Sequence, residues 1–352
     1  MNAMTATTAM SARSAAAAPR PSRQPPLPGA DELAAVRVAA AEIAGEAGAD
    51  LLRRFAQPID VRFKSKKDAD PVTEADEATE AFIRNAVARR FPAHGVLGEE
   101  GGGGNDAADW LWVVDPLDGT ANFANGVAIF AVSIGILYRL RPVVGALFTS
   151  FGPFGRPCVL SAQLGGGLLL DGAPFLQPER VLSKRARTAG VPAGIHRAFV
   201  LWRLRGQLPG ETRSFGSTAA ELGLVACGRW QYAVFSSPRL WDVAAGAVLV
   251  REGGGVMLTD RRGRWRPLDR VVLPAGKPLS EWKQAVIAGD AALLRELTGK
   301  VRVRRSLRER AERLIGAERL AAVERVLRPL RRPARATRRA VAALRGRTRR
   351  PA

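Results

Sequence analysis

A short segment that places two aspartates directly after an apolar run constrains this chain most. The run Trp110–Val114 is typical of a buried strand, and Asp115-Pro-Leu-Asp118-Gly-Thr120 follows it without a break. Aspartate is unfavourable inside strands and Pro116 cannot donate a ladder hydrogen bond, so we expect the strand to end at Pro116. Ligands bind at the carboxyl ends of strands in open α/β sheets, and closely spaced carboxylates favour a hard cation between them. The segment therefore predicts a Mg²⁺ site at the end of a strand.

Taken alone, the segment also fits an ordinary surface turn, because Asp-Pro and Asp-Gly pairs are common in turns. Three more acid-rich segments favour a site. Asp68–Asp76 forms a turn that leads into a helical pattern, Glu99-Glu100 follows a short apolar segment, and Trp241-Asp242 opens an Ala- and Val-rich helical run. Because strand and helix patterns separate these segments, we interpret them as one site that the fold assembles.

These segments resemble the signature of the inositol monophosphatase family of Mg²⁺-dependent, lithium-sensitive phosphatases. The family combines an Asp, a Glu-Glu pair, Asp-Pro-(Ile/Leu)-Asp-Gly-Thr, and a Trp-Asp pair that is followed after eleven residues by Gly-Gly. The matching residues of this chain are Asp76, Glu99-Glu100, Asp115–Thr120, Trp241-Asp242 and, after residues 243–253, Gly254-Gly255. The resemblance extends roughly from Asp31 to Leu297 and is specific, because order, identity and spacing agree.

The resemblance implies an α/β fold, a layered αβαβα sandwich of the inositol monophosphatase and fructose bisphosphatase type. It implies hydrolysis of a phosphate monoester by a metal-activated water. The implied ligands of a first Mg²⁺ are Glu99, Asp115 and the backbone carbonyl of Leu117. Those of a second Mg²⁺, beside the leaving oxygen, are Asp115, Asp118 and Asp242. Thr120 would orient the water while Asp76 polarises its hydroxyl, and the N–H groups of Gly119 and Thr120 would hold the phosphate.

Two further segments are expected at the substrate. Gly216, Ser217 and Thr218 precede a helical pattern over 219–227, and free N–H groups at such a helix start favour an anion or a polar ligand. Inositol-hydrolysing members have a glutamate six residues before the Trp-Asp pair, and this position is Phe235 here. A phenyl ring cannot accept a hydrogen bond from a sugar hydroxyl. The substrate is therefore left open among inositol 1-phosphate-like compounds, histidinol phosphate, sugar phosphates and nucleotide 3′-phosphates.

The positive charge of the chain is concentrated at its C-terminus. Residues 300–352 hold 19 Lys and Arg against four Asp and Glu, a net charge of +15 out of +21 for all 352 residues. Leu307, Ala311 and Leu314 begin an amphipathic helical pattern, and an Arg-rich stretch follows Pro329. A solvated tail fits this composition, and so does a segment that contacts nucleic acid or an anionic membrane surface. The alternative function is accordingly a binding or regulatory protein that keeps the phosphatase scaffold and contacts RNA or an anionic surface through this tail.

The predicted organisation has four parts. They are a disordered leader over 1–30, an N-terminal α+β half with the metal site over 31–160, a C-terminal α/β half over 161–299 and the basic tail over 300–352. In the N-terminal half we expect a helix that Asp31 caps and that reaches Phe55, and two strands, 128–137 and 143–149, joined at Arg141-Pro142. Lys66 and Lys67 could face the phosphate, although a lysine-rich loop is more often solvated.

Cysteine usage and hydropathy indicate where the chain works. The two cysteines are too few and too isolated for a disulfide framework, which favours a reducing compartment. The N-terminal segment lacks the continuous apolar run of a secretory signal. We therefore expect a cytoplasmic enzyme. We also expect the protein to form a homodimer.

Overall fold

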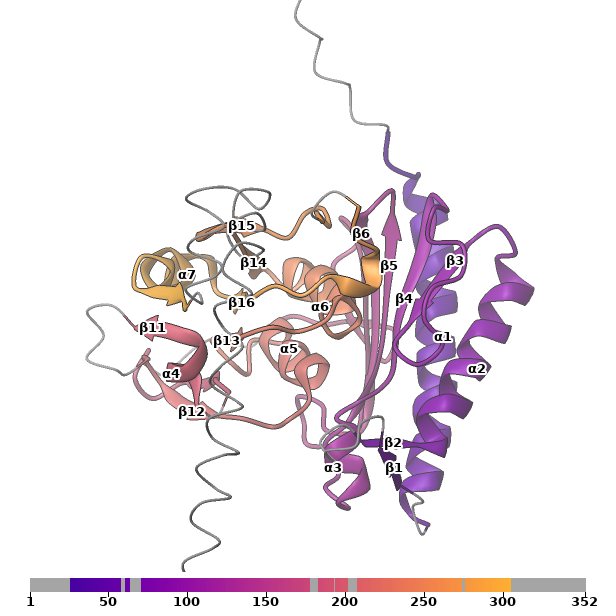
Figure 1. Cartoon of the computed structure of the whole chain (residues 1–352), viewed down its shortest axis with the longest axis horizontal. Coiled ribbons are helices and arrows are strands. Elements are labelled where there is room, and N and C mark those ends of the chain that lie inside the picture. Colours follow the sequence, from indigo (N-terminus) through magenta and orange to yellow (C-terminus); the bar gives the residue numbers. More distant parts are fainter. Residues whose placement is uncertain are drawn as a thin grey trace, which may run out of the picture.

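The computed structural model describes residues 26–57, 61–63, 71–177, 183–192, 194–201, 208–273 and 276–304. Within these ranges helices and sheets alternate in layers, so the predicted α/β sandwich is confirmed (Figure 1). The predicted leader apart from residues 26–30, the pair Lys66-Lys67 and the helical tail after residue 304 lie outside the described residues. No helix of the described part is long and apolar enough to span a membrane.

Helices α1 (Ala30–Phe55) and α2 (Glu74–Arg90) form the first layer. The predicted apolar face of α1 is buried, with Leu33, Val36, Ala40, Ile43 and Leu51. Contrary to the prediction, Asp31 does not cap this helix. The N-cap residue is Gly29, and Asp31 lies in the first turn, where a negative charge favours the helix dipole.

A seven-stranded sheet in the order β3-β4-β5-β6-β7-β8-β9 forms the second layer. Its strands are β3 (Gly95–Gly98), β4 (Trp110–Asp118), β5 (Ala131–Tyr138), β6 (Arg141–Thr149), β7 (Cys158–Gln163), β8 (Leu168–Leu170) and β9 (Ala173–Pro174). The pair β3-β4 is parallel and the other neighbours are antiparallel. The β5-β6 turn is at Arg139-Leu140, whose φ angles are positive, and not at Arg141-Pro142, which begin β6.

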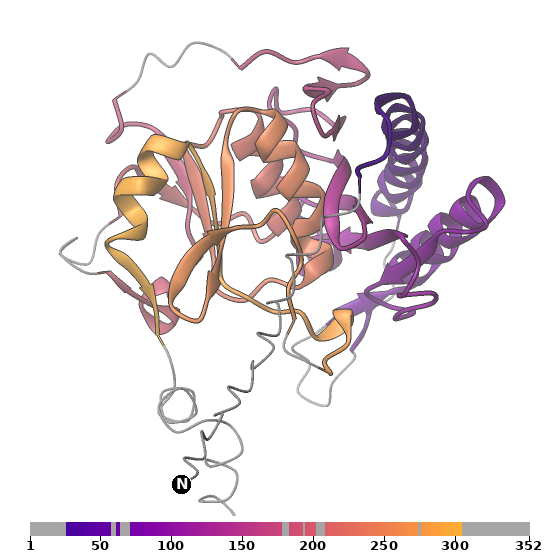
Figure 2. The same cartoon turned by 90° about the horizontal axis from the view of Figure 1, so that it is seen from above.

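Helices α5 (Thr218–Ala226) and α6 (Leu240–Glu252) lie between this sheet and a second one. The second sheet has the order β12 (Glu211–Arg213), β10 (Thr188–Gly190), β13 (Tyr232–Phe235), β16 (Val286–Gly289), β14 (Val256–Arg261) and β15 (Arg264–Pro267). Helix α7 (Ala291–Thr298) covers its outer face (Figure 2). The short elements are β1 (Val61–Phe63), β2 (Pro71–Thr73), α3 (Thr120–Ala124), α4 (Ile195–Ala198), β11 (Phe199–Leu201), η1 (Leu279–Glu281) and β17 (Val301–Val303).

Two predicted domain boundaries differ from those of the structure. The boundary between 160 and 161 cuts β7, and the first sheet continues to Pro174 because β8 and β9 extend the same antiparallel ladder. The predicted tail began at residue 300, but β17 pairs with β11 and the side chain of Val301 is fully buried. The folded part therefore includes residues 301–303.

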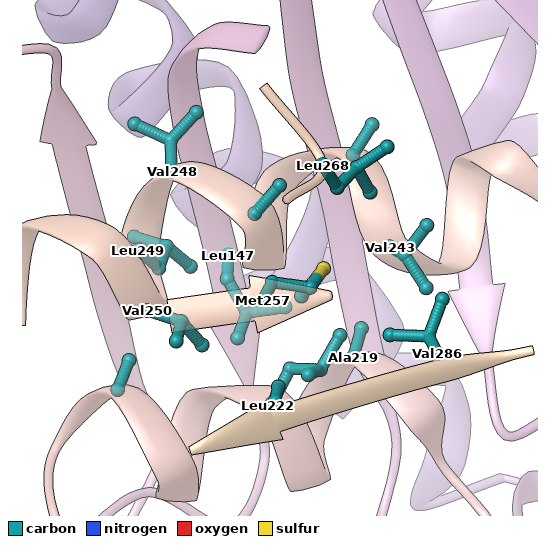
Figure 3. Close-up of a cluster of buried hydrophobic side chains, with 14 of the residues drawn as sticks. Leu147, Ala219, Leu222, Val243, Val248, Leu249, Val250, Met257, Leu268 and Val286 are labelled. Carbon is teal, nitrogen blue, oxygen red and sulfur yellow. The ribbon is translucent and has the colours of Figure 1, made fainter. Parts of the chain in front are cut away.

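The middle layer is packed through small and branched apolar side chains. Leu222 of α5 and Val243 and Val250 of α6 point toward Met257 and Val286 of the second sheet, with Leu147 of the first sheet nearby (Figure 3). At about 25 cal/mol per Å² of buried apolar surface, such a cluster holds both sheets to the same helices. The fold thereby fixes the first turn of α6 relative to the end of β4.

Candidate active site

A bulge at the end of β4 brings Asp115 and Asp118 to the same site. Asp115 pairs with Ser133 and Asp118 pairs with Ala131, so β4 has one extra residue between these two pairs. In a regular strand, residues three apart point to opposite faces, and one extra residue reverses that alternation. The expected end of the strand at Pro116 is therefore wrong: the strand runs to Asp118, and Pro116 lies in the bulge, where a missing N–H is tolerated.

The turn after β4 positions Thr120 beside Asp76. Gly119 has φ +94°, and a Cβ there would lie 3.0 Å from the Ile129 carbonyl oxygen, which explains the glycine. The Thr120 hydroxyl is 3.0 Å from Oδ1 of Asp76 and 2.9 Å from the carbonyl oxygen of Leu117. It has one proton, so it donates to one of these oxygens at a time.

Asp76 is fixed by the start of α2. Its Oδ2 accepts hydrogen bonds from the backbone N–H of Thr73 at 2.7 Å and from the Thr73 hydroxyl at 2.6 Å. Oδ1 remains for Thr120. Burial raises the pKa of Asp76, and the bonds from Thr73 and Thr120 partly oppose this shift. The predicted Asp76–Thr120 pair is therefore assembled as expected.

Asp118 faces the start of α5. Its Oδ2 accepts hydrogen bonds from the Ser217 hydroxyl and from the backbone N–H of Ala219, both at 2.6 Å. Ser217 is also the N-cap of α5, because its oxygen accepts from Ala220 N–H at 3.3 Å. We had expected Ser217 to contact the substrate. Its side chain is instead 1% exposed and engaged with Asp118, so it positions a carboxylate.

Asp242 lies in the first turn of α6, where its Oδ2 accepts from the backbone N–H of Arg239 at 2.8 Å. The same turn is bonded to the first sheet, because the Ser133 hydroxyl donates to the carbonyl of Trp241 at 3.0 Å. Ser133 is the ladder partner of Asp115. One residue of β5 therefore links the β4 bulge to the helix that carries Asp242.

The carboxylates raise one another's pKa; Asp115 is buried, and Asp118 and Asp242 are partly buried. Burial, followed by the charges of Glu99, Asp118 and Asp242, raises the pKa of Asp115 well above its usual value. Burial raises the pKa of Asp118 to about 6, despite the bond from Ser217. Burial and the charge of Asp118 raise the pKa of Asp242 to about 8. A positive charge among these groups would favour all of their ionised forms.

Comparisons with known proteins agree with this geometry. The sequence profile described as "Inositol monophosphatase family" matches residues 32–298. The chain belongs to this family. It is 35% identical over 231 residues to an inositol-1-monophosphatase of Rhizobium meliloti, covering 64% of this chain and 85% of that protein. It is 35% identical over 271 residues to "Nus factor SuhB" of Pseudomonas aeruginosa, covering 68% of this chain and 90% of that protein.

Solved structures give the same result. The structure of an inositol monophosphatase from Anabaena (Nostoc) sp. PCC 7120 superposes with a TM-score of 0.57 at 26% identity, covering 76% of this chain and 96% of that one. The protein described here is thus a phosphatase, that is, a hydrolase of phosphoric monoesters.

The donor set of this phosphatase fits a hard divalent cation. All the predicted ligands offer oxygen atoms, and three of them are carboxylates whose raised pKa values reflect burial and like charge. Within the described residues, no three Asp, Glu, His or Cys side chains are gathered closely enough to hold an ion. The carboxylates of Asp118 and Asp242 accept hydrogen bonds from the protein, which keeps both groups aimed at the site.

The other predicted substrate residues have different surroundings. Gly216 has φ +75°, and a Cβ there would lie 3.2 Å from Oδ1 of Asn122. Thr218 is the first residue of α5, and its backbone N–H also bonds Asp118. Phe235 ends β13 and is only 7% exposed within the core of the C-terminal half. The contact of Phe235 with substrate stays a prediction. In the structure, its side chain packs within the hydrophobic core.

Sequence reasoning missed three residues that support the phosphatase site. The Asn122 amide donates to the carbonyls of Ile129 and Phe215 at 2.8 and 2.7 Å, so it joins α3 to the loop before α5. Glu221 accepts from Phe215 N–H at 2.6 Å, and burial raises its pKa to about 7. Glu80 bonds the loop that carries Glu99. Helix periodicity placed Glu80 on α2, but no signal in the sequence indicated its distant partners.

Proposed function

We propose that this phosphatase hydrolyses a small phosphate monoester with Mg²⁺ held by Glu99, Asp115, Asp118, Asp242 and the carbonyl of Leu117. The observation that carries the proposal is the gathering of mutually repelling carboxylates, one buried and two partly buried, at the β4 bulge and the start of α6. A protein that only bound a partner would gain nothing from this repulsion. When bound, Mg²⁺ supplies Lewis-acid stabilisation of phosphate oxygens and lowers the pKa of water.

The protein's own contribution is to orient the groups that react. With its proton directed to Oδ1 of Asp76, the Thr120 hydroxyl can accept a hydrogen bond from the attacking water. The backbone N–H groups of Gly119 and Thr120, at the left-handed turn, would bind the phosphate oxygens. Neither His94 nor His196 lies in one of the acid-rich motifs, so the proposal needs no covalent intermediate on imidazole.

The preferred substrate is proposed to be a monoester that does not require a carboxylate acceptor at position 235. Phe235 supplies no hydrogen-bond acceptor for an inositol hydroxyl but can stack on an imidazole, which favours histidinol phosphate over inositol 1-phosphate; a sugar phosphate is the third candidate. A panel of these three monoesters and a nucleotide 3′-phosphate, assayed for phosphate release with and without Mg²⁺, tests the proposal. We expect Mg²⁺-dependent release and a lower kcat/KM for inositol 1-phosphate. Release that ignores Mg²⁺ would contradict it.

Lithium inhibition is part of the same proposal. Li⁺ is a weak, hard cation that would take the oxygen ligands of the second ion after hydrolysis and trap the product phosphate. We expect Li⁺ at roughly tens of millimolar, the range in which a weak hard cation binds such oxygen ligands, to inhibit phosphate release. The inhibition should be strongest at saturating Mg²⁺. Full activity under these conditions would place this chain outside the lithium-sensitive members.

A second candidate function is binding of a polyanion, and one surface of the C-terminal half favours it. Arg264, Arg295 and Arg302 line a hollow of about 710 Å³ between β15, α7 and β17. None of the three has an ion pair or hydrogen bond through its guanidinium within the described residues. The relative named Nus factor SuhB also keeps this alternative open. Salt-dependent binding of single-stranded RNA that is lost in Arg264→Ala and Arg302→Ala, without loss of phosphatase activity, would support it.

A further inference from the structure

Glu80 lies one turn after Asp76 on α2, and its carboxylate contacts the loop that carries Glu99. The side chain of Glu80 is 3% exposed. Its Oε2 accepts a hydrogen bond from Glu100 N–H at 2.8 Å, and its Oε1 accepts one from Gly101 N–H at 2.7 Å. One buried carboxylate therefore bonds two consecutive N–H groups of the loop that follows β3.

Arg84, one turn further along α2, completes this contact. Its Nε donates to Oε1 of Glu80 at 2.9 Å, which compensates the buried charge. Its terminal nitrogens donate to the carbonyls of Gly102 at 2.5 Å and Val96 at 3.3 Å. The Glu80–Arg84 pair therefore bonds both N–H and C=O groups of residues 96–102.

The closeness of this pair explains the glycines on either side of Glu99-Glu100. A Cβ at Gly98 would overlap the carboxyl group of Glu80. A Cβ at Gly101 would lie 2.7 Å from Oε1 of Glu80 and 3.2 Å from Nε of Arg84. Neither glycine has a positive φ, so space and not backbone conformation requires them.

The loop has to keep Glu99 at the site against electrostatic repulsion. Glu99 faces several carboxylates, since its charge raises the pKa values of Asp115, Asp118 and Asp242. Its backbone N–H bonds the carbonyl of Val114 at 3.2 Å, which fixes one end of the loop to β4. The next two N–H groups along the chain are those that Glu80 accepts from.

We propose that Glu80, braced by Arg84, is a positioning residue that holds the 98–102 loop so that Glu99 is in place before Mg²⁺ binds. The inference rests on the proposed function, because it takes Glu99 as a ligand of Mg²⁺. Groups that orient metal ligands without touching the metal are often worth a large factor in metal affinity. The carboxylate of Glu80 is such a group for Glu99.

The substitution Glu80→Gln tests this role with little change in size. An amide would present an NH₂ group to an N–H donor and would lose the charge that Arg84 pairs with. In the metal-free protein we expect faster hydrogen exchange of the amides of residues 98–102. We also expect the Mg²⁺ concentration for half-maximal phosphate release to rise about tenfold or more, while kcat at saturating Mg²⁺ stays within about threefold of the wild type.

Two further variants make the test specific. Gly101→Ala keeps Glu80 but forces its carboxylate and the loop apart, so we expect the same rise in exchange and in Mg²⁺ requirement. Glu46→Gln removes an exposed carboxylate from α1, outside the acid-rich segments of the site, and should match the wild type. Melting temperatures, measured alongside, show that all three variants are folded.

Three outcomes separate the possibilities. Wild-type exchange and a wild-type Mg²⁺ requirement in both Glu80→Gln and Gly101→Ala would overturn the inference. A lower melting temperature and kcat with an unchanged Mg²⁺ requirement would show a purely structural role and would overturn it as well. A wild-type protein that releases no phosphate with Mg²⁺ would contradict the proposed function instead, and hydrogen exchange of the metal-free protein would still decide whether Glu80 holds the loop.

Discussion

At the scale of single residues, the site combines groups that repel one another with groups that hold them. Asp115 is buried and Asp118 and Asp242 are partly buried, each with like charges around it, and Ser217 donates to Asp118 at 2.6 Å. The hydrogen bonds fix the direction of each carboxylate, but they do not neutralise it. A bound cation would do so, and the metal-free protein should therefore show the cost of the repulsion.

The first prediction is that the metal-free protein loses stability as pH rises. The native pKa values of about 6 for Asp118 and about 8 for Asp242 exceed the unfolded value of 3.8. The native state thus binds more protons between about pH 4 and pH 8, and its free energy of unfolding falls through this range. Melting temperatures in EDTA at pH 5 to 8 should decline, and Mg²⁺ should restore them at pH 8. A melting temperature that rises over this range without metal would contradict the prediction.

The second prediction concerns Ser217, which caps α5 and positions Asp118. Ser217→Ala removes the N-cap oxygen and one hydrogen bond to a buried carboxylate, which should cost about 1–2 kcal/mol in the free energy of unfolding. Because Asp118 loses the group that aims it, the Mg²⁺ requirement should rise as well. Ser217→Thr keeps the hydroxyl and serves as the control. An unchanged Mg²⁺ requirement in Ser217→Ala would mean that Asp118 does not depend on this bond.

At the scale of elements, α6 must lie close to the first sheet for Asp242 to reach the β4 bulge. The sequence provides glycines where the two meet. A Cβ at Gly135 of β5 would lie 2.6 Å from the backbone carbon of Ala244, and one at Gly145 of β6 would lie 2.5 Å from the carbonyl oxygen of Ala245. These contacts pack β5 and β6 closely against α6, which follows them by about a hundred residues in the sequence.

The third prediction follows from this packing. Gly135→Ala should push α6 away from β5, lowering both the melting temperature and the Mg²⁺-dependent activity, because Asp242 moves with the helix. Gly45→Ala in α1 is the control, since its Cβ would lie 3.5 Å from the Val159 side chain in ordinary contact. It should raise stability by about 0.5–1 kcal/mol, because alanine favours a helix over glycine. Equal melting temperatures for both variants would refute the packing argument.

How much the sequence could predict also differs between elements. The apolar period of α1, the helix after Ser217 and the acid-rich motifs at the ends of β3 and β4 were predicted, because each depends on neighbouring residues. The β4 bulge was not, since Pro116 reads as a strand end until the pairing with β5 is known. The contact between Ser217 and Asp118 joins residues that are 99 positions apart in the sequence. The contact between Glu80 and Gly101 joins residues that are 21 positions apart. No local pattern encodes such contacts.

At the scale of the whole molecule, the folded phosphatase extends beyond the predicted boundary at residue 299. β17 pairs with β11, and Trp265 Nε1 of β15 donates to the carbonyl of Val301 at 2.9 Å. The basic composition of residues 300–352 conceals this strand. Charge composition therefore placed the start of the predicted tail inside a segment that includes a strand.

The fourth prediction tests this boundary. A chain that ends at Arg304 should keep the melting temperature and phosphatase activity of the full chain, because the catalytic groups and β17 are all present. A chain that ends at Leu297 lacks β17 and the buried Val301 and should melt at a lower temperature, since burial of one such side chain is worth about 1.5–3 kcal/mol. Equal stability of the two shortened chains would show that β17 contributes nothing to the fold.

The central claim, that the clustered carboxylates form a Mg²⁺ site for phosphate hydrolysis, is tested most directly by Asp118→Asn. Asparagine keeps the shape of the side chain and removes one charged ligand and one source of repulsion. Phosphate release from the monoester panel should be measured against Mg²⁺ concentration, with the metal-free melting temperature of both proteins. We predict Mg²⁺-dependent turnover in the wild type, and in Asp118→Asn no turnover at saturating Mg²⁺ with an equal or higher melting temperature. A near-normal rate in Asp118→Asn at saturating Mg²⁺ would contradict the account.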